Sequence, residues 1–60
     1  MNDKLIKLPA VLELIQISRS NWYAMVASGK APQPVKINRA SFWSLIAVQE
    51  FIEDIKAGEY

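Results

Sequence analysis

The sequence predicts a mainly α-helical domain of three helices with a small β-hairpin wing, arranged as a winged helix-turn-helix. Two short helical segments follow one another within the region 9–28. The next segment, 30–43, contains two closely spaced prolines, which exclude a helix there. After Ser44, apolar residues recur at intervals of three and four, as they do along one face of a helix.

The length and composition exclude several classes of protein. A chain of 60 residues predicts a single domain, 1–60, because it buries only about 60% of its unfolded surface and has one small core. It contains no His and no Cys, so imidazole bases, thiolate nucleophiles and Cys/His zinc sites are excluded. We therefore expect no enzyme activity, no metal and no cofactor. Lys7 and Pro9 interrupt the apolar start, so neither a secretory signal nor a membrane span is expected.

The first elements are a short strand and a short helix. Residues Lys4–Leu8 tolerate extended geometry, and the proline that follows Leu8 disfavours helical geometry at that residue. Pro9 suits the first turn of a helix, where its missing N–H has no partner to lose. We expect this helix over about 9–15, followed by a turn at Gln16-Ile17.

The second helix is expected over about 19–28. Ser18 is a natural N-cap whose hydroxyl can accept from the backbone N–H of Ser20 or Asn21, and Gly29 can take the left-handed geometry that ends a helix. A rotation of 100° per residue gives this helix an inner and an outer side. The inner side carries Trp22, Met25, Val26 and Gly29, and the outer side carries Ser20, Tyr23, Ala24 and Ala27, with Arg19 and Asn21 at its flanks.

Four residues of this helix are candidate contacts for a nucleic acid. The amide of Asn21 can pair with two atoms of adenine, and Arg19 can reach guanine or a phosphate. A capping role in the first turn explains Asn21 equally well. Ser20 and Tyr23 are expected to donate to phosphates, because such contacts come from hydroxyl groups and helix N-termini.

The segment after the second helix is expected to form the wing, over about 36–41. Residues 35–37 alternate apolar and basic, Asn38 and Arg39 can form a turn, and residues 40–43 return. Lys36, Asn38 and Arg39 would then lie at or near an exposed tip, which contacts the DNA backbone or enters the minor groove. The alternative is a solvated hairpin whose lysine protects an edge strand.

The third helix is expected to begin after Ser44 and to end at Gly58. Its apolar stripe consists of Leu45, Val48, Phe51, Ile52 and Ile55, and its exposed side carries Gln49, Glu50, Glu53 and Asp54. Those carboxylates lie on a solvated face with no nucleophile beside them. Catalysis there is therefore not expected.

The charges divide the chain into two unlike halves. The net charge is only +1, but residues 1–39 hold six basic and two acidic side chains, or +4. Residues 40–60 hold one basic and four acidic side chains, or −3. The positive half contains the second helix and the hairpin, as in a nucleic-acid-binding protein. The alternative is that both sets are ordinary solvated charges.

The order and spacing of these residues resemble the AlpA family of small prophage regulators, which are similar to excisionases and to the DNA-binding domains of MerR-type regulators. The resemblance covers residues 5–55 and rests on Leu8-Pro9-Ala10-Val11-Leu12, Ser18-Arg19-Ser20, Tyr23, Gly29, residues 32–36, Arg39-Ala40, Trp43, Val48 and Phe51-Ile52. Ala24 departs from the pattern, because the family commonly has Arg or Lys there, and the wing tip is one residue shorter.

The resemblance implies a bacterial, cytoplasmic regulator that binds double-stranded DNA upstream of phage or integrative-element genes. It would activate transcription or direct excision, with RNA polymerase or an integrase (a recombinase) as its protein partner. The recognition helix would be 19–28, in the major groove. A chain this small covers only part of a DNA site, so we expect self-association or several adjacent copies. The alternatives are a module that docks a recombinase or a transcription protein, and an architectural excision factor without a transcriptional role.

Overall fold

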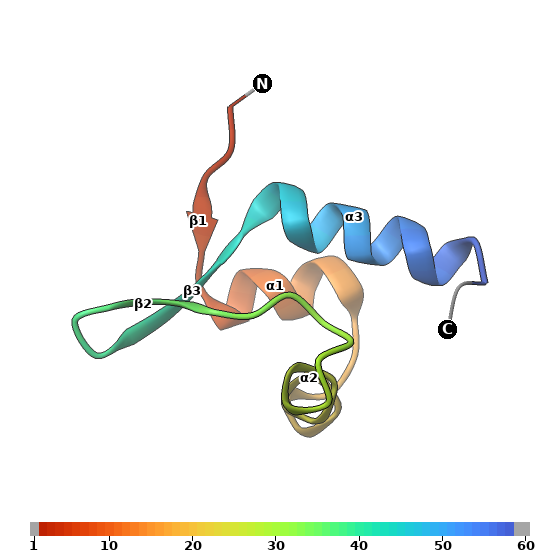
Figure 1. The fold of residues 1–60 in the computed structure, drawn as a ribbon, viewed down its shortest axis with the longest axis horizontal. Helices are drawn as coiled ribbons and strands as arrows, with labels where there is room; N and C mark the ends of the chain where they lie inside the picture. The colour runs from red at the N-terminus through yellow and green to blue at the C-terminus, as the bar shows by residue number, and fades with distance from the viewer. Residues whose placement is uncertain (1, 59–60) are drawn as a thin grey trace.

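The computed structural model describes residues 2–58, which form three helices and a three-stranded antiparallel sheet (Figure 1). The elements in chain order are β1 (Leu5–Ile6), α1 (Leu8–Ile15), α2 (Arg19–Ala27), β2 (Val35–Ile37), β3 (Ala40–Ser44) and α3 (Leu45–Lys56). The domain is mainly helical and compatible with a winged helix-like fold, in agreement with the expected class. No helix in the described part of the chain is long and apolar enough to cross a membrane.

The sheet has the strand order β1-β3-β2, so β3 is its central strand. β2 and β3 form the expected hairpin, in which Ile37 pairs with Ala40 across a two-residue turn. Asn38, the first turn residue, has a φ of 57°, a left-handed geometry that Asn tolerates better than most residues. The expected strand Lys4–Leu8 is only Leu5–Ile6, because Lys7 already caps α1.

α1 begins one residue before the expected start at Pro9. Lys7 is extended, and its carbonyl accepts from the N–H groups of Ala10 and Val11 at 3.1 and 3.2 Å. Pro9 still lies in the first turn, where no hydrogen bond needs its N–H. The helix ends at Ile15, as expected, with Gln16 in left-handed geometry at a φ of 60°.

α2 begins at the expected cap and ends one residue earlier than expected. The Ser18 hydroxyl accepts from the Asn21 N–H at 3.1 Å, which selects one of the two expected donors. The helix ends at Ala27 instead of Ser28, since Ser28 has become its C-cap. Gly29 has a φ of 83°, the left-handed geometry that the sequence predicted for it.

The core is built around two fully buried tryptophans, Trp22 of α2 and Trp43 of β3. The Trp22 ring meets the rings of Trp43 and Phe51 edge-on, each at 5.9 Å between centroids. Trp43 Nε1 donates to the carbonyl of Pro32 at 3.1 Å, which fixes the segment between α2 and the hairpin. The core is completed by Ile6, Val11, Ala31 and Val48. Trp22 therefore determines which side of α2 is left facing solvent.

α3 packs on this core through most of the expected stripe. Val48 and Phe51 are buried, and Leu45 and Ile52 pack partly against them. Ile55 was expected in the same stripe, but 39% of its surface is exposed. The reason is visible in Figure 1, where the C-terminal end of α3 extends beyond the other helices. Gly58 closes the helix with a φ of 79°, as expected.

Candidate nucleic-acid interface

All the candidate contact residues are exposed, and they lie on two elements that project from the core. Figure 1 shows the β2–β3 hairpin extending away from the helices, with α2 as a separate projection. α2 carries Arg19, Ser20, Asn21 and Tyr23, and the hairpin carries Lys36, Asn38 and Arg39. The candidate contact residues therefore form two groups, one on the exposed side of α2 and one on the exposed part of the hairpin.

The N-terminal turn of α2 is open to a ligand. Among residues 2–58, the only side-chain cap in this turn is the Ser18 hydroxyl on the Asn21 N–H, and the turn contains no acidic residue. Unpaired N–H groups and the positive end of the helix dipole favour an anion at such a terminus. Arg19 and Ser20 lie in this turn, so its side chains can also bind an anion.

The outward side of α2 is as the sequence predicted. Tyr23 is 46% exposed, while its neighbour Trp22 is buried, so successive side chains point to opposite environments. Ala24 and Ala27 are exposed and small, which permits close approach of a bulky partner. The capping role considered for Asn21 belongs to its backbone N–H, and its side chain has no hydrogen bond within residues 2–58. Its amide is available for contacts.

The hairpin presents its two cations differently. The Lys36 ammonium donates to the Ser41 hydroxyl at 2.7 Å, and these residues are directly paired across the two strands. Lys36 is thus held over the hairpin in the middle of β2. Arg39 lies in the turn itself, next to Asn38. Of the two cations, Arg39 is the one at the tip.

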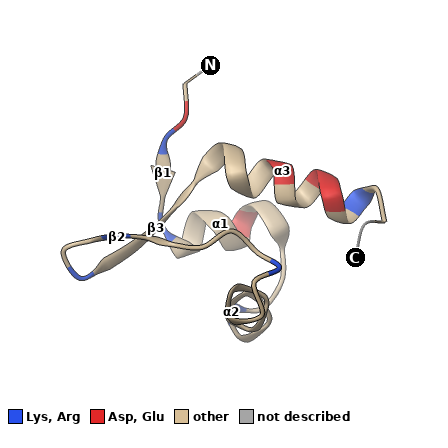
Figure 2. Cartoon of the chain, in the orientation of Figure 1, with Lys and Arg blue, Asp and Glu red and all other residues tan. Residues whose placement is uncertain are grey.

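The charge separation expected from the sequence is visible in Figure 2, where the ribbon of α3 is coloured at acidic positions and that of the hairpin at basic ones. Glu50, Glu53 and Asp54 are exposed on α3. Glu53 pairs with Lys56 at 3.1 Å, with both side chains about two-thirds exposed. An anionic duplex would therefore be repelled from α3 and attracted to the hairpin.

Asp3 has a role that no sequence pattern indicates. Its carboxylate accepts from the Ser44 hydroxyl, from the Ile46 N–H at 3.0 Å and from the Lys4 N–H at 2.8 Å. These hydrogen bonds, that from Ser44 first, lower the pKa of Asp3 below its ordinary value. The Ser44 hydroxyl also accepts from the Ala47 N–H at 3.1 Å, as the predicted cap of α3. The N-terminus of α3 is thus closed by the chain's own carboxylate.

Two further contacts connect the hairpin, and the segment before it, to the helices. The Lys7 ammonium lies 5.7 Å from the centroid of the Phe42 ring on β3, a cation–π geometry. The Gln33 amide donates to the carbonyl of Val26 at 2.8 Å, linking the segment before β2 to the end of α2. The first contact joins the start of α1 to β3, and the second joins residues only seven positions apart. They fix the base of the hairpin relative to the helices.

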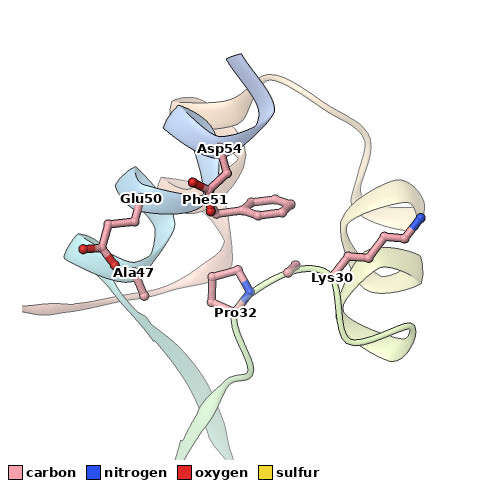
Figure 3. Close-up of a pocket in the computed structure, with 7 residues that line it drawn as sticks. Lys30, Pro32, Ala47, Glu50, Phe51 and Asp54 are labelled. Carbon is pink, nitrogen blue, oxygen red and sulfur yellow. The ribbon is translucent and has the colours of Figure 1, made fainter. Parts of the chain in front are cut away.

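A surface hollow lies between α3 and the segment that follows α2 (Figure 3). Ala31, Pro32, Ala47 and Phe51 line it with apolar surface, and Glu50 and Asp54 are exposed beside it. The described residues contain no group of three or more His, Cys, Asp or Glu that would hold a metal ion.

The chain was compared with protein-family models, with curated proteins and with solved structures, and none of these comparisons found a match.

Proposed function

We propose that this chain binds double-stranded DNA, with α2 in the major groove and the β2–β3 hairpin on the adjacent backbone or in the minor groove. The observation that carries the proposal is the N-terminal turn of α2, which has no acidic residue and receives a single side-chain cap from the part of the chain that the structure describes. Such a turn attracts a phosphate. An α-helix about 10–12 Å in diameter also fits a major groove about 12 Å wide.

The candidate residues on α2 have two proposed roles: contacts to phosphates, which position the helix, and contacts to bases, which read the DNA sequence. Ser20 and Tyr23 are exposed hydroxyl donors suited to phosphates, which set the register of the helix on the duplex. Asn21 has an exposed amide suited to adenine, and Arg19 can bind guanine or a phosphate. Ala24 adds no donor. Specificity therefore has few sources within α2.

The hairpin supplies the second contact. Arg39 in the turn would lie along the phosphate backbone or enter the minor groove, where the negative potential favours arginine. Lys36, held by Ser41, would contribute charge toward the flank of the duplex. The exposed cations of the hairpin add to Arg19 at the start of α2, while the acidic side of α3 faces away from the DNA.

We further propose that the chain acts as a regulator of prophage or integrative-element genes, or directs excision of such an element. This role rests on the resemblance to AlpA regulators described above. Several copies would bind neighbouring sites, because α2 and one hairpin cover only a few base pairs. Footprinting on the DNA that flanks the gene would test this, with protection of several adjacent short sites as the expected result and one isolated short site as the contradicting one.

The salt dependence of binding tests the DNA proposal. Affinity for a duplex should fall steeply as salt rises, and Arg39→Ala should lower affinity on all sequences and reduce the log–log salt slope by about 0.9, the value of one phosphate contact. Fluorescence anisotropy with labelled duplexes measures both. Lys56→Ala is the matched control, since it removes a cation from α3 and should change neither affinity nor slope. Absence of binding at low salt, or affinity that ignores salt, would contradict the proposal.

A further inference from the structure

A second hollow, which we call the α1–α3 hollow, lies between α1, α3 and the start of the chain. Its volume is about 350 Å³. Residues of α1 and α3 form most of its wall, and β1 and the residue before it complete the lining. The lining residues are Lys4, Ile6, Ala10, Glu13, Leu14, Leu45 and Gln49. None of them belongs to α2 or to the hairpin, the two elements that project in Figure 1.

The apolar side chain that this hollow presents to solvent is Leu14. It is 43% exposed. The other large aliphatic residues of α1 lie in the core or pack against it: Leu8, Val11, Leu12 and Ile15. Ala10, one turn before Leu14, and Leu45 of α3 are half-buried in the lining of the same hollow. Leu14 therefore offers apolar surface that a partner could remove from water.

The hollow carries one charge of each sign. Lys4 and Glu13 are both exposed, and within residues 2–58 neither side chain forms an ion pair. Their hydrogen bonds use backbone atoms, the N–H of Lys4 and the carbonyl of Glu13. A partner that matches this surface must therefore supply an anion, a cation and an apolar side chain. A second copy of the same surface supplies all three.

We propose that two copies of the chain associate through their α1–α3 hollows about a two-fold axis, with Leu14 of each copy against Ala10 and Leu45 of the other. In a two-fold contact, a residue that faces another is faced by it in return. Each Lys4 then faces Glu13 of the other copy, and both charges are paired twice over. A partner of a single charge sign would leave one of them unpaired, so charge complementarity favours the second copy.

The association goes beyond the proposed function, because it requires no DNA and leaves α2 and the hairpin uncovered. The contact surface is one small hollow on each copy, so the dimer should be weak and should form at high protein concentration. Burial of Leu14 supplies most of the affinity. The pairs of Lys4 with Glu13 select the register, since exposed ion pairs contribute little free energy.

Sedimentation of the full chain, without DNA, tests the proposal. From micromolar to millimolar concentration, the weight-average mass should rise from the monomer mass of 6.8 kDa toward twice that value and no further. Leu14→Ser should stay at the monomer mass over the same range, and circular dichroism should show that it folds, because Leu14 is exposed in the monomer. An unchanged chain that stays monomeric, a mass beyond the dimer, or a Leu14→Ser variant that dimerises equally well overturns the proposal.

A charge exchange tests the register. Glu13→Lys places two cations opposite each other and Lys4→Glu places two anions opposite each other, so each variant alone should dimerise more weakly than the unchanged chain. Mixed in equal amounts, the two variants should form a dimer, because every cation at the contact then faces an anion. Asp54→Lys reverses a charge of α3 outside this hollow and should associate like the unchanged chain. A mixture that associates no better than its separate components overturns the proposal.

DNA binding provides an independent reading. Leu14 lies outside the proposed DNA contact, so Leu14→Ser should bind a duplex with a single site as tightly as the unchanged chain does. Loss of the dimer with DNA binding retained supports the separate surface. A chain that dimerises as described but binds no duplex leaves this inference intact and contradicts only the proposed function.

Discussion

α2 and α3 have the same kind of serine N-cap, but the groups around their N-termini differ. Each follows a serine whose hydroxyl accepts from the N–H three residues later, Ser18 in α2 and Ser44 in α3. At α3, the carboxylate of Asp3 arrives from the start of the chain and accepts from the Ile46 N–H. At α2, no acidic residue lies in the first turn.

The two N-termini differ in their capacity to bind an external anion. In α3 the chain's own carboxylate occupies the position that a phosphate would take at a helix N-terminus. In α2 that position is open, and it is flanked by Arg19 and Ser20 instead of acidic side chains. The start of α3 therefore has a structural role, and we propose a binding role for the start of α2.

The largest expected effect separates the two sides of α2. Trp22→Ala should remove about 3–5 kcal/mol of stability, because Trp22 is fully buried against Trp43 and Phe51. A core of this size rarely supplies more than about 3–5 kcal/mol, so the loss equals the whole stability and most molecules of the variant should be unfolded at room temperature. Circular dichroism measures this. Tyr23→Ala is the control on the exposed side and should melt close to the unchanged chain, whereas similar melting of both variants would contradict this division of α2.

The next effect concerns base recognition by α2. Asn21→Ala should weaken binding at one base pair of the site by about 1–3 kcal/mol and leave other positions unchanged, because a lost bidentate contact affects only the base that it reads. Competition binding with duplexes substituted one base pair at a time measures this. An equal loss on every sequence would remove Asn21 from base recognition and leave it a phosphate contact.

The two serine caps provide a smaller and more direct comparison. Ser18→Ala should cost about 1 kcal/mol, the usual value of an N-cap. Ser44→Ala should cost more, because it also removes the hydroxyl that donates to Asp3. Urea unfolding of both variants measures which substitution lowers the free energy of unfolding more. Equal costs would mean that the Asp3 contact adds nothing to the stability of α3.

The smallest effect concerns the charge of Asp3. Since its pKa is lowered in the folded chain from the ordinary value of 3.8, its stabilising contribution is present above that pH and is lost as the pH falls through the folded pKa. The melting temperature of Asp3→Asn should therefore lie below that of the unchanged chain at neutral pH, and the two should converge in acid. Glu13→Gln, a similar change on α1, is the control. A difference independent of pH would show that the charge of Asp3 has no role.

Local signals predicted most of the fold, because caps and turns are determined within a few residues. Ser18, Gly29 and Ser44 took the expected roles, and Asn38 entered the expected turn. The contact between Asp3 and Ser44 spans 41 positions and has no local signature. A lone acidic residue near the N-terminus does not reveal which helix it will cap.

Periodicity likewise did not reveal where the core ends. Ile55 fits the apolar stripe of α3 but extends past the packed part of the molecule. The candidate contacts on α2 could be placed on its outward side because Trp22 sets the helix orientation. Their position relative to the hairpin depends on long-range packing, including the hydrogen bond from Trp43 to Pro32.

The measurement that most directly tests the contrast between the two helices is a titration of the isotope-labelled chain with duplex DNA, followed by the NMR shifts of its backbone amides. We predict that the largest shifts fall on residues 19–23 and 36–39, and that the amides of Ile46 and Ala47 at the start of α3 stay in place. Shifts concentrated at the start of α3, with α2 unchanged, would contradict the assignment of the binding role to α2.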